Sequence, residues 1–126
     1  MAAPAWQALP FAPSPGTALA PLATLPDGAG RELTFGKGKS MFRMFVVRRG
    51  GVVTAFVNRC PHMSLPLNSH PDEFMTSDGD RIMCRMHLAV FRTSDGMCES
   101  GACEGSALEQ MAVVVKDGVV MLSEGP

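Results

Sequence analysis

Two stretches of this chain carry its most informative residues: residues 58–67 read NRCPHMSLPL and residues 82–91 read IMCRMHLAVF. Each stretch pairs a cysteine with a histidine, Cys60 with His62 and Cys84 with His87. Two thiolates and two imidazoles make a complete set of four metal ligands. The Cys-x-His spacing is tighter than the Cys-x2-4-Cys and His-x3-5-His pairs of zinc fingers. The two stretches therefore predict a metal centre that is built on two loops.

Two other interpretations of these four residues stay open at this point. A structural Cys2His2 zinc site uses the same ligand types, and cysteine and histidine also occur in protein interiors without a metal. Outside the two stretches, Cys98 and Cys103 could close a small disulfide, although a reducing compartment favours free thiols. His70 lies in a polar segment, and we expect it at the surface.

The composition limits the class of protein. At 126 residues the chain is long enough for one domain and too short for two ordinary ones. The net charge of −1 offers no electrostatic reason to expect nucleic acid or an anionic membrane as a partner. No run reaches the roughly 18 apolar residues that span a bilayer, and the N-terminus lacks the basic segment of a secretory signal. We therefore expect a cytoplasmic protein without a membrane span.

The remainder of the chain predicts short strands that are separated by turns. Residues 1–20 are rich in Ala and Pro and are expected to form an extended arm, with residues 21–126 as the domain. Gly50-Gly51 and Asp117-Gly118 are expected to turn two hairpins. Because no segment repeats its apolar residues with a sustained period of 3.6, we expect an all-β fold. The expected strands are 22–25, 33–35, 42–48, 52–58, 73–75, 81–84, 89–92, 112–115 and 119–122.

From about residue 20 to residue 124 the chain resembles the Rieske iron–sulfur proteins, in which two His replace two Cys on one iron of a 2Fe–2S cluster. The stretch 58–67 is similar to the first cluster loop of that family, and the stretch 82–91 is similar to the second. The resemblance implies a Rieske-type antiparallel β-sandwich with the two cluster-binding loops at one end.

The same resemblance implies a role for each ligand. Cys60 and Cys84 would bind the buried iron, whereas His62 and His87 would bind the outer iron and face solvent and a redox partner. One Rieske-type 2Fe–2S cluster per chain is the expected cofactor. The chain departs from the family pattern at Leu88, because a Gly commonly follows the second ligand His, and a bulky residue restricts the backbone there.

A third loop of the family covers the cluster and usually holds a proline after a glycine. Residues 93–105 take this place here, and Asp95-Gly96 and the Gly101-x-Cys103-x-Gly105 pattern fit it. Ala102 stands where the proline is expected. High-potential members also carry hydroxyl groups that bond the cluster sulfurs, and Ala89 and Phe91 occupy the matching positions here. We therefore expect a reduction potential at the low end of the Rieske range.

A cluster without a substrate pocket transfers single electrons, and only His70 remains for a mononuclear iron site of two His and a carboxylate. We therefore expect a stand-alone, monomeric Rieske-type ferredoxin that passes electrons from a reductase to a terminal acceptor such as an oxygenase. It would be an electron-transfer protein or oxidoreductase component rather than an enzyme by itself. Two alternatives stay open: a small Rieske subunit of a multi-subunit oxidoreductase similar to nitrite reductase, and a structural zinc module.

Overall fold

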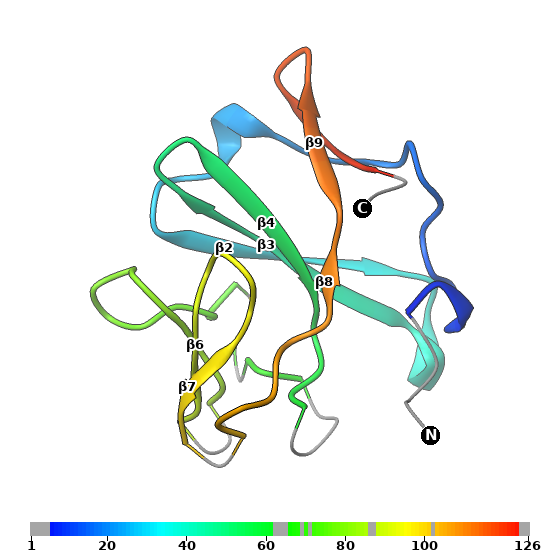
Figure 1. Cartoon of the computed structure of the whole chain (residues 1–126). Helices are drawn as coiled ribbons and strands as arrows, with labels where there is room; N and C mark the ends of the chain where they lie inside the picture. Colours follow the sequence, from blue (N-terminus) through cyan, green and yellow to red (C-terminus); the bar gives the residue numbers. More distant parts are fainter. Residues whose placement is uncertain are drawn as a thin grey trace.

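The structure, a computed structural model, describes residues 6–61, 66–68, 70, 72–85, 88–101 and 103–123. Its strands form three antiparallel sheets, in the orders β1-β10-β9, β2-β3-β4-β8 and β5-β6-β7 (Figure 1). The strands are β1 Ala18–Pro21, β2 Ala29–Phe35, β3 Phe42–Arg49, β4 Val52–Val57, β5 Ile82–Met83, β6 Val90–Phe91, β7 Cys98–Ser100, β8 Gln110–Met111, β9 Val113–Lys116 and β10 Val119–Leu122. Short 3-10 turns, η1 to η3, lie at Trp6–Ala8, Leu22–Thr24 and Gly38–Ser40.

The predicted all-β fold is confirmed. The described residues contain no α-helix, and every pair of strands in the three sheets is antiparallel. Within the same residues no helix is long and apolar enough to cross a bilayer.

Strand β3 lies between the two hydrophobic cores of the molecule. Phe45 and Val47 belong to one core, whereas Met44 and Val46 belong to the other, and all four side chains are buried. Successive side chains of a strand point to opposite faces of the sheet. The continuous apolar run in the middle of β3 therefore covers both cores at once.

Both hairpins predicted from turn residues are confirmed. In the first, Arg49 pairs with Val52 across Gly50-Gly51. In the second, Lys116 pairs with Val119, and both turn residues between them have positive φ, 52° at Asp117 and 76° at Gly118. Asp-Gly is favoured in such a type I′ turn because both central positions need a left-handed backbone.

Two of the predicted strands are wrong. Residues 22–24 form a 3-10 turn instead, because β1 ends at Pro21 and the N–H of Leu22 bonds the carbonyl of Gly118. Residues 73–75 form no strand, although Met75 makes an isolated antiparallel bridge to Ile82. Phe74 is fully buried there and stacks on Phe45 with ring centroids 4.2 Å apart. The apolar residues of both segments predicted buried strands. Tertiary contacts determine the backbone conformation of these segments instead.

One end of the molecule gathers the connections that matter for the predicted site. The described residues of three segments, after β4, between β5 and β6, and between β7 and β8, reach the lower end of the view in Figure 1. The sheet β5-β6-β7 stands beside them. The core that contains Phe45 and Phe74 continues to this end and includes all four cysteines of the chain.

Candidate metal centre

The two cysteines of the predicted site lie at the bases of two neighbouring loops. Cys60 follows β4, Cys84 follows β5, and the side chains are 1% and 0% exposed. Both belong to the same buried core. His62 and His87 lie outside the described residues. The fold thus brings the two predicted thiolate ligands into one buried, apolar region, as a buried iron would require.

Asn58 holds the first loop closed at its base. Its side-chain Oδ1 accepts a hydrogen bond of 2.8 Å from the backbone N–H of Leu67, which lies at the far end of the loop. Its backbone N–H donates to the carbonyl of Arg43 on β3. Asn58 is the one polar residue among the buried side chains of the described chain, at 5% exposure. A buried amide with several partners fixes backbone positions more firmly than an exposed one does.

Glu32 on β2 accepts hydrogen bonds from residues at the same loop base. Its carboxylate accepts hydrogen bonds from Arg43 at 2.7 Å, from Asn58 at 2.8 Å and from Asn68 at 3.1 Å. Burial raises the pKa of Glu32, but the bonds from Arg43, Asn68 and Asn58 outweigh burial and leave the pKa below its usual value. A carboxylate with several donors is stabilised in its charged form. The first loop therefore rests on a charged, hydrogen-bonded network.

The second loop is closed by its own backbone and joined to the first. The N–H of Cys84 donates to the carbonyl of Ala89 at 2.9 Å, and the N–H of Arg85 donates to the carbonyl of Leu67 at 2.8 Å. Leu88 has a positive φ of 57° and a side chain that is 63% exposed. The loop thus takes the left-handed conformation of a glycine at Leu88, the position where the family pattern has one.

The third loop packs on the second through a glycine. Gly101 has a φ of 101°, and a Cβ atom there would lie 2.7 Å from the Cα of Ala89. Cys103 is 5% exposed and shares its buried core with Cys98 and Cys60. Burial, together with Cys98 and Cys60, raises the pKa of the Cys103 thiol to about 12. Cys103 therefore stays protonated at neutral pH.

The four cysteines do not form a metal site by themselves. All four lie in the described residues and are buried, and no disulfide joins any two of them. Among the described residues, no three His, Cys, Asp or Glu side chains are arranged to hold a metal ion. The buried pair of Cys60 and Cys84 fits the two-thiolate end of a 2Fe–2S cluster, and the remaining ligands must come from other residues. His70 is a surface residue, as predicted, with its side chain 78% exposed.

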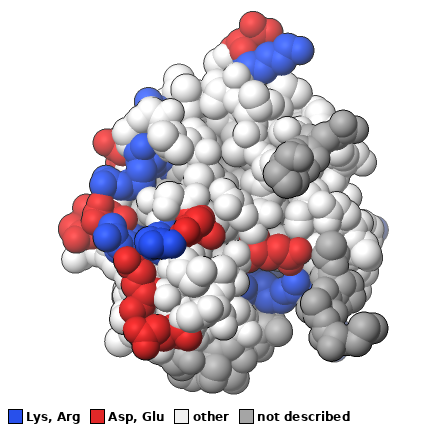
Figure 2. All heavy atoms as spheres, in the orientation of Figure 1, with Lys and Arg blue, Asp and Glu red and all other residues white. Residues whose placement is uncertain are grey.

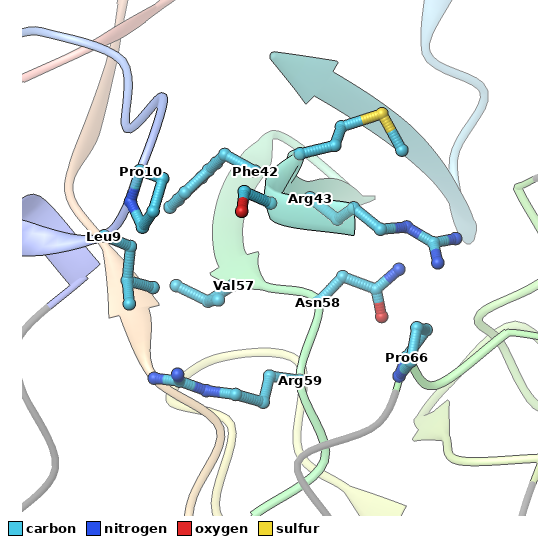
Figure 3. Close-up of a pocket in the computed structure, with 10 residues that line it drawn as sticks. Leu9, Pro10, Phe42, Arg43, Val57, Asn58, Arg59 and Pro66 are labelled. Atoms are coloured by element: carbon cyan, nitrogen blue, oxygen red, sulfur yellow. The ribbon is translucent and has the colours of Figure 1, made fainter. Parts of the chain in front are cut away.

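The N-terminal arm packs against the start of the first loop. The carboxylate of Glu109 accepts hydrogen bonds from the backbone N–H of Trp6 at 2.8 Å and from Arg59 at 2.9 Å. A cavity of about 220 Å³ lies between the arm and the loop. Leu9 and Pro10 line it on one side, and Asn58 and Pro66 line it on the other (Figure 3). Trp6 itself is buried, so the arm is part of the packing beside the site.

Charged side chains on the face shown in Figure 2 are mixed in sign. A chain of ion pairs runs from Arg49 to Asp80, from Asp80 to Arg81 and from Arg81 to Glu99. Paired charges of this kind cancel one another and leave little net field for a polyanion.

Sequence reasoning named Cys60 and Cys84 but missed the residues that hold them in place. Asn58, Glu32 and Asn68 act through contacts between segments that are distant in the sequence. One local signal existed: Asn58 is a polar residue that directly follows an apolar strand and precedes the predicted ligand by two positions. The sequence around Glu32 carries no local signal that links it to the predicted ligands.

Comparison with known proteins agrees with this geometry. The family model of the Rieske [2Fe-2S] domain matches residues 18–117. A ferredoxin of carbazole 1,9a-dioxygenase from Nocardioides aromaticivorans IC177 has a similar structure, with a TM-score of 0.66 at 23% identity over 89% of this chain and 100% of that chain. A ferredoxin of Sphingomonas yanoikuyae B1 gives a TM-score of 0.65 at 23% identity over 87% of this chain and 99% of that one.

A third similar structure comes from a reduced complex between oxygenase and ferredoxin in carbazole 1,9a-dioxygenase. It has a TM-score of 0.70 at 18% identity, and the match covers 89% of this chain but 30% of that one. No curated protein sequence matches the chain.

Proposed function

The chain belongs to the Rieske [2Fe-2S] family, and from this premise we propose that it is a ferredoxin that passes single electrons from a reductase to a terminal acceptor such as an oxygenase. Membership of the family confirms the predicted class of protein, an electron-transfer protein with a Rieske-type 2Fe–2S cluster. The cluster supplies the redox chemistry when it is bound, and the protein supplies ligands, burial and hydrogen bonds.

The proposed ligands are Cys60 and Cys84 for the inner iron and His62 and His87 for the outer iron. The observation that carries this assignment is the burial of both cysteines in one core, at the bases of two loops that the Arg85–Leu67 hydrogen bond joins. Apolar surroundings keep water from the thiolate ligands and so influence the potential. Imidazole ligands on the outer iron would leave that iron nearer to a partner.

The coverage of the similar structures supports the role of a small carrier. The similar ferredoxins match this chain over nearly their whole length, whereas the oxygenase complex matches over 30% of its chain. The proposal places the carrier in the cytoplasm as a monomer, and β1 joins the end of its N-terminal arm to β10 of the cluster domain. A single narrow band in size-exclusion chromatography at the mass of one chain would support the monomer, and a stable larger assembly would favour the alternative of a reductase subunit.

Metal analysis tests the proposed site directly. Protein purified from iron-replete cells should contain two irons and two acid-labile sulfides per chain. Replacement of Cys60 or Cys84 by Ala should abolish the cluster, whereas Cys98→Ala should retain it, because Cys98 is a buried cysteine outside the proposed ligand set. One zinc per chain without labile sulfide would overturn the proposal.

A further inference from the structure

The N-terminal arm is fixed to the domain at both of its described ends. The family model begins at residue 18, so residues 6–17 precede the matched domain. Trp6 is 6% exposed and packs in one core with Phe42, with ring centroids 6.0 Å apart. At the other end, the N–H of Gly16 donates to the carbonyl of Leu122 on β10 at 2.8 Å. The arm is therefore a packed part of the molecule.

Between these ends, the arm keeps a strained residue in close contact with the segment after β2. Phe11 has a φ of 61°, and a Cβ at Gly36 would lie 2.2 Å from the Phe11 ring. Real Cβ atoms do not approach other atoms so closely, so only glycine fits beside the ring. A bulky residue at positive φ persists where its surroundings fix the backbone. The contacts of the arm therefore determine its path.

One carboxylate joins the arm to the start of the first loop. Oε2 of Glu109 accepts a hydrogen bond of 2.8 Å from the backbone N–H of Trp6, and Oε1 accepts one of 2.9 Å from Nη2 of Arg59. The carbonyl of Glu109 also accepts from the N–H of Val57 at 2.9 Å. Arg59 directly precedes Cys60, and its side chain extends toward the arm (Figure 3). Glu109 thus contacts the arm with one oxygen and the loop with the other.

We propose that the N-terminal arm is a strap that holds the start of the first loop in place, with Glu109 as the joint between arm and loop. A carboxylate that accepts from two donors is fixed more firmly than one with a single donor. Release of the arm therefore frees Glu109 to turn away from Arg59. The strap positions Cys60 through Arg59, and its release loosens the loop and speeds loss of the cluster. The effect on the cluster rests on the proposed function, whereas the effect on the loop does not.

Hydrogen exchange of the backbone amides of residues 57–60 tests the strap in the full chain. Trp6→Ala should speed this exchange by about fivefold, which is the equivalent of one lost hydrogen bond. Leu19→Ala is the control, because Leu19 is 8% exposed in the same core but lies on β1. It should leave the exchange of residues 57–60 close to the wild-type rate. An unchanged rate in Trp6→Ala would overturn the inference.

A double variant tests the joint. Glu109→Ala by itself should also speed the exchange of residues 57–60, because it removes both side-chain bonds. Addition of Trp6→Ala to Glu109→Ala should then change the rate no further, since the arm acts on the loop through this carboxylate. Rate changes that multiply in the double variant would contradict the role of Glu109.

Fluorescence gives a measurement that keeps Trp6 in place. The chain has one tryptophan and no tyrosine, so the emission wavelength reports the burial of Trp6 and shows whether the protein is folded. In Glu109→Ala, the exchange of residues 57–60 should be faster than in the wild type while the emission is still that of a buried indole. Exchange as slow as in the wild type would refute the inference even if Trp6→Ala fails to fold.

Cluster release separates the strap from the proposed function. With a chelator present, the visible absorbance of cluster-loaded Trp6→Ala should decay about fivefold faster than that of Leu19→Ala. Equal decay rates would show that the arm does not act on the cluster and would overturn that part of the inference. Wild-type protein without iron and labile sulfide would refute the proposed function instead, and the exchange rates would still test the strap.

Discussion

The backbone N–H of Arg85 donates a hydrogen bond of 2.8 Å to the carbonyl oxygen of Leu67. Leu67 ends the first loop and Arg85 begins the second, so this one bond joins the two segments that follow Cys60 and Cys84. The N–H of Leu67 is itself held by the side chain of Asn58. The bond therefore couples the bases of the two loops that carry Cys60 and Cys84.

Replacement of Asn58 by Ala should destabilise the protein by about 3 kcal/mol, because it removes three hydrogen bonds and leaves buried partners unpaired. The thermal midpoint of the cluster-loaded protein should fall by roughly 12 °C, at about 4 °C for each kcal/mol, and the cluster should be lost faster on heating. Gln110→Ala is the control, because Gln110 is exposed and makes one long bond of 3.4 Å to Ser94. Equal midpoints for the two variants would contradict the role assigned to Asn58.

Gly101→Ala and Gly105→Ala form a matched pair. Both glycines have positive φ, 101° and 90°, but a Cβ at Gly101 meets Ala89 at 2.7 Å, whereas a Cβ at Gly105 meets no atom within 4 Å. Gly105→Ala should therefore cost only the backbone strain, about 1 to 2 kcal/mol. Gly101→Ala should cost about 1 to 3 kcal/mol more, because the third loop must separate from the second. Thermal unfolding checks the difference, and a similar loss in both variants would argue against close packing at Gly101.

Leu88→Gly should stabilise the protein by about 1 kcal/mol. Leu88 has a positive φ of 57° and leaves 63% of its surface exposed, so glycine relieves strain and forfeits little burial. Asp117→Gly serves as the comparison, since Asp117 has a similar φ of 52° but is a residue type that tolerates it better. Its gain should be smaller. A thermal midpoint that falls in Leu88→Gly would show that the leucine side chain contributes contacts of its own.

The stability of the protein should depend on pH through Glu32. Burial raises the pKa of Glu32, but the hydrogen bonds from Arg43, Asn68 and Asn58 together lower it by more. The folded-state pKa therefore lies below the usual 4.5. A depressed carboxyl pKa adds stability that is present above the unfolded pKa and is lost as pH falls through the folded pKa. Glu32→Gln should therefore be less stable than the wild type at neutral pH.

The difference in stability between the two proteins should shrink as pH falls below about 4.5. Denaturation midpoints of both proteins, measured from pH 7 to pH 3, give this difference directly. Any loss of stability that the cluster causes in acid is common to both proteins, so it cancels in the difference between their midpoints. A constant difference across the whole range would contradict a charged Glu32 in the network.

The midpoint potential should lie toward the low end of the Rieske range, which spans about −150 to +300 mV. Ala89 and Phe91 are fully buried beside the second loop and carry no hydroxyl group. Redox titration at neutral pH checks this, and a midpoint well above about +150 mV would overturn it.

Local chemistry was enough to predict part of the fold. Gly50-Gly51 and Asp117-Gly118 turn the hairpins that they were expected to turn, because a two-residue turn depends on the φ angles of the turn residues themselves. Residues 22–24 and 73–75 were predicted wrongly as strands. Their apolar side chains indicated burial, but Pro21 and the stacking of Phe74 on Phe45 determined the backbone.

The sequence by itself determined the family and the cofactor, because two Cys-His pairs in the order and spacing of residues 60–87 are properties of the chain that no packing alters. Only the tertiary structure decided what surrounds the two cysteines. Glu32 on β2 reaches Asn58, which follows β4, because β3 holds β2 and β4 in one sheet. Such contacts depend on the register of whole sheets, which no local pattern encodes.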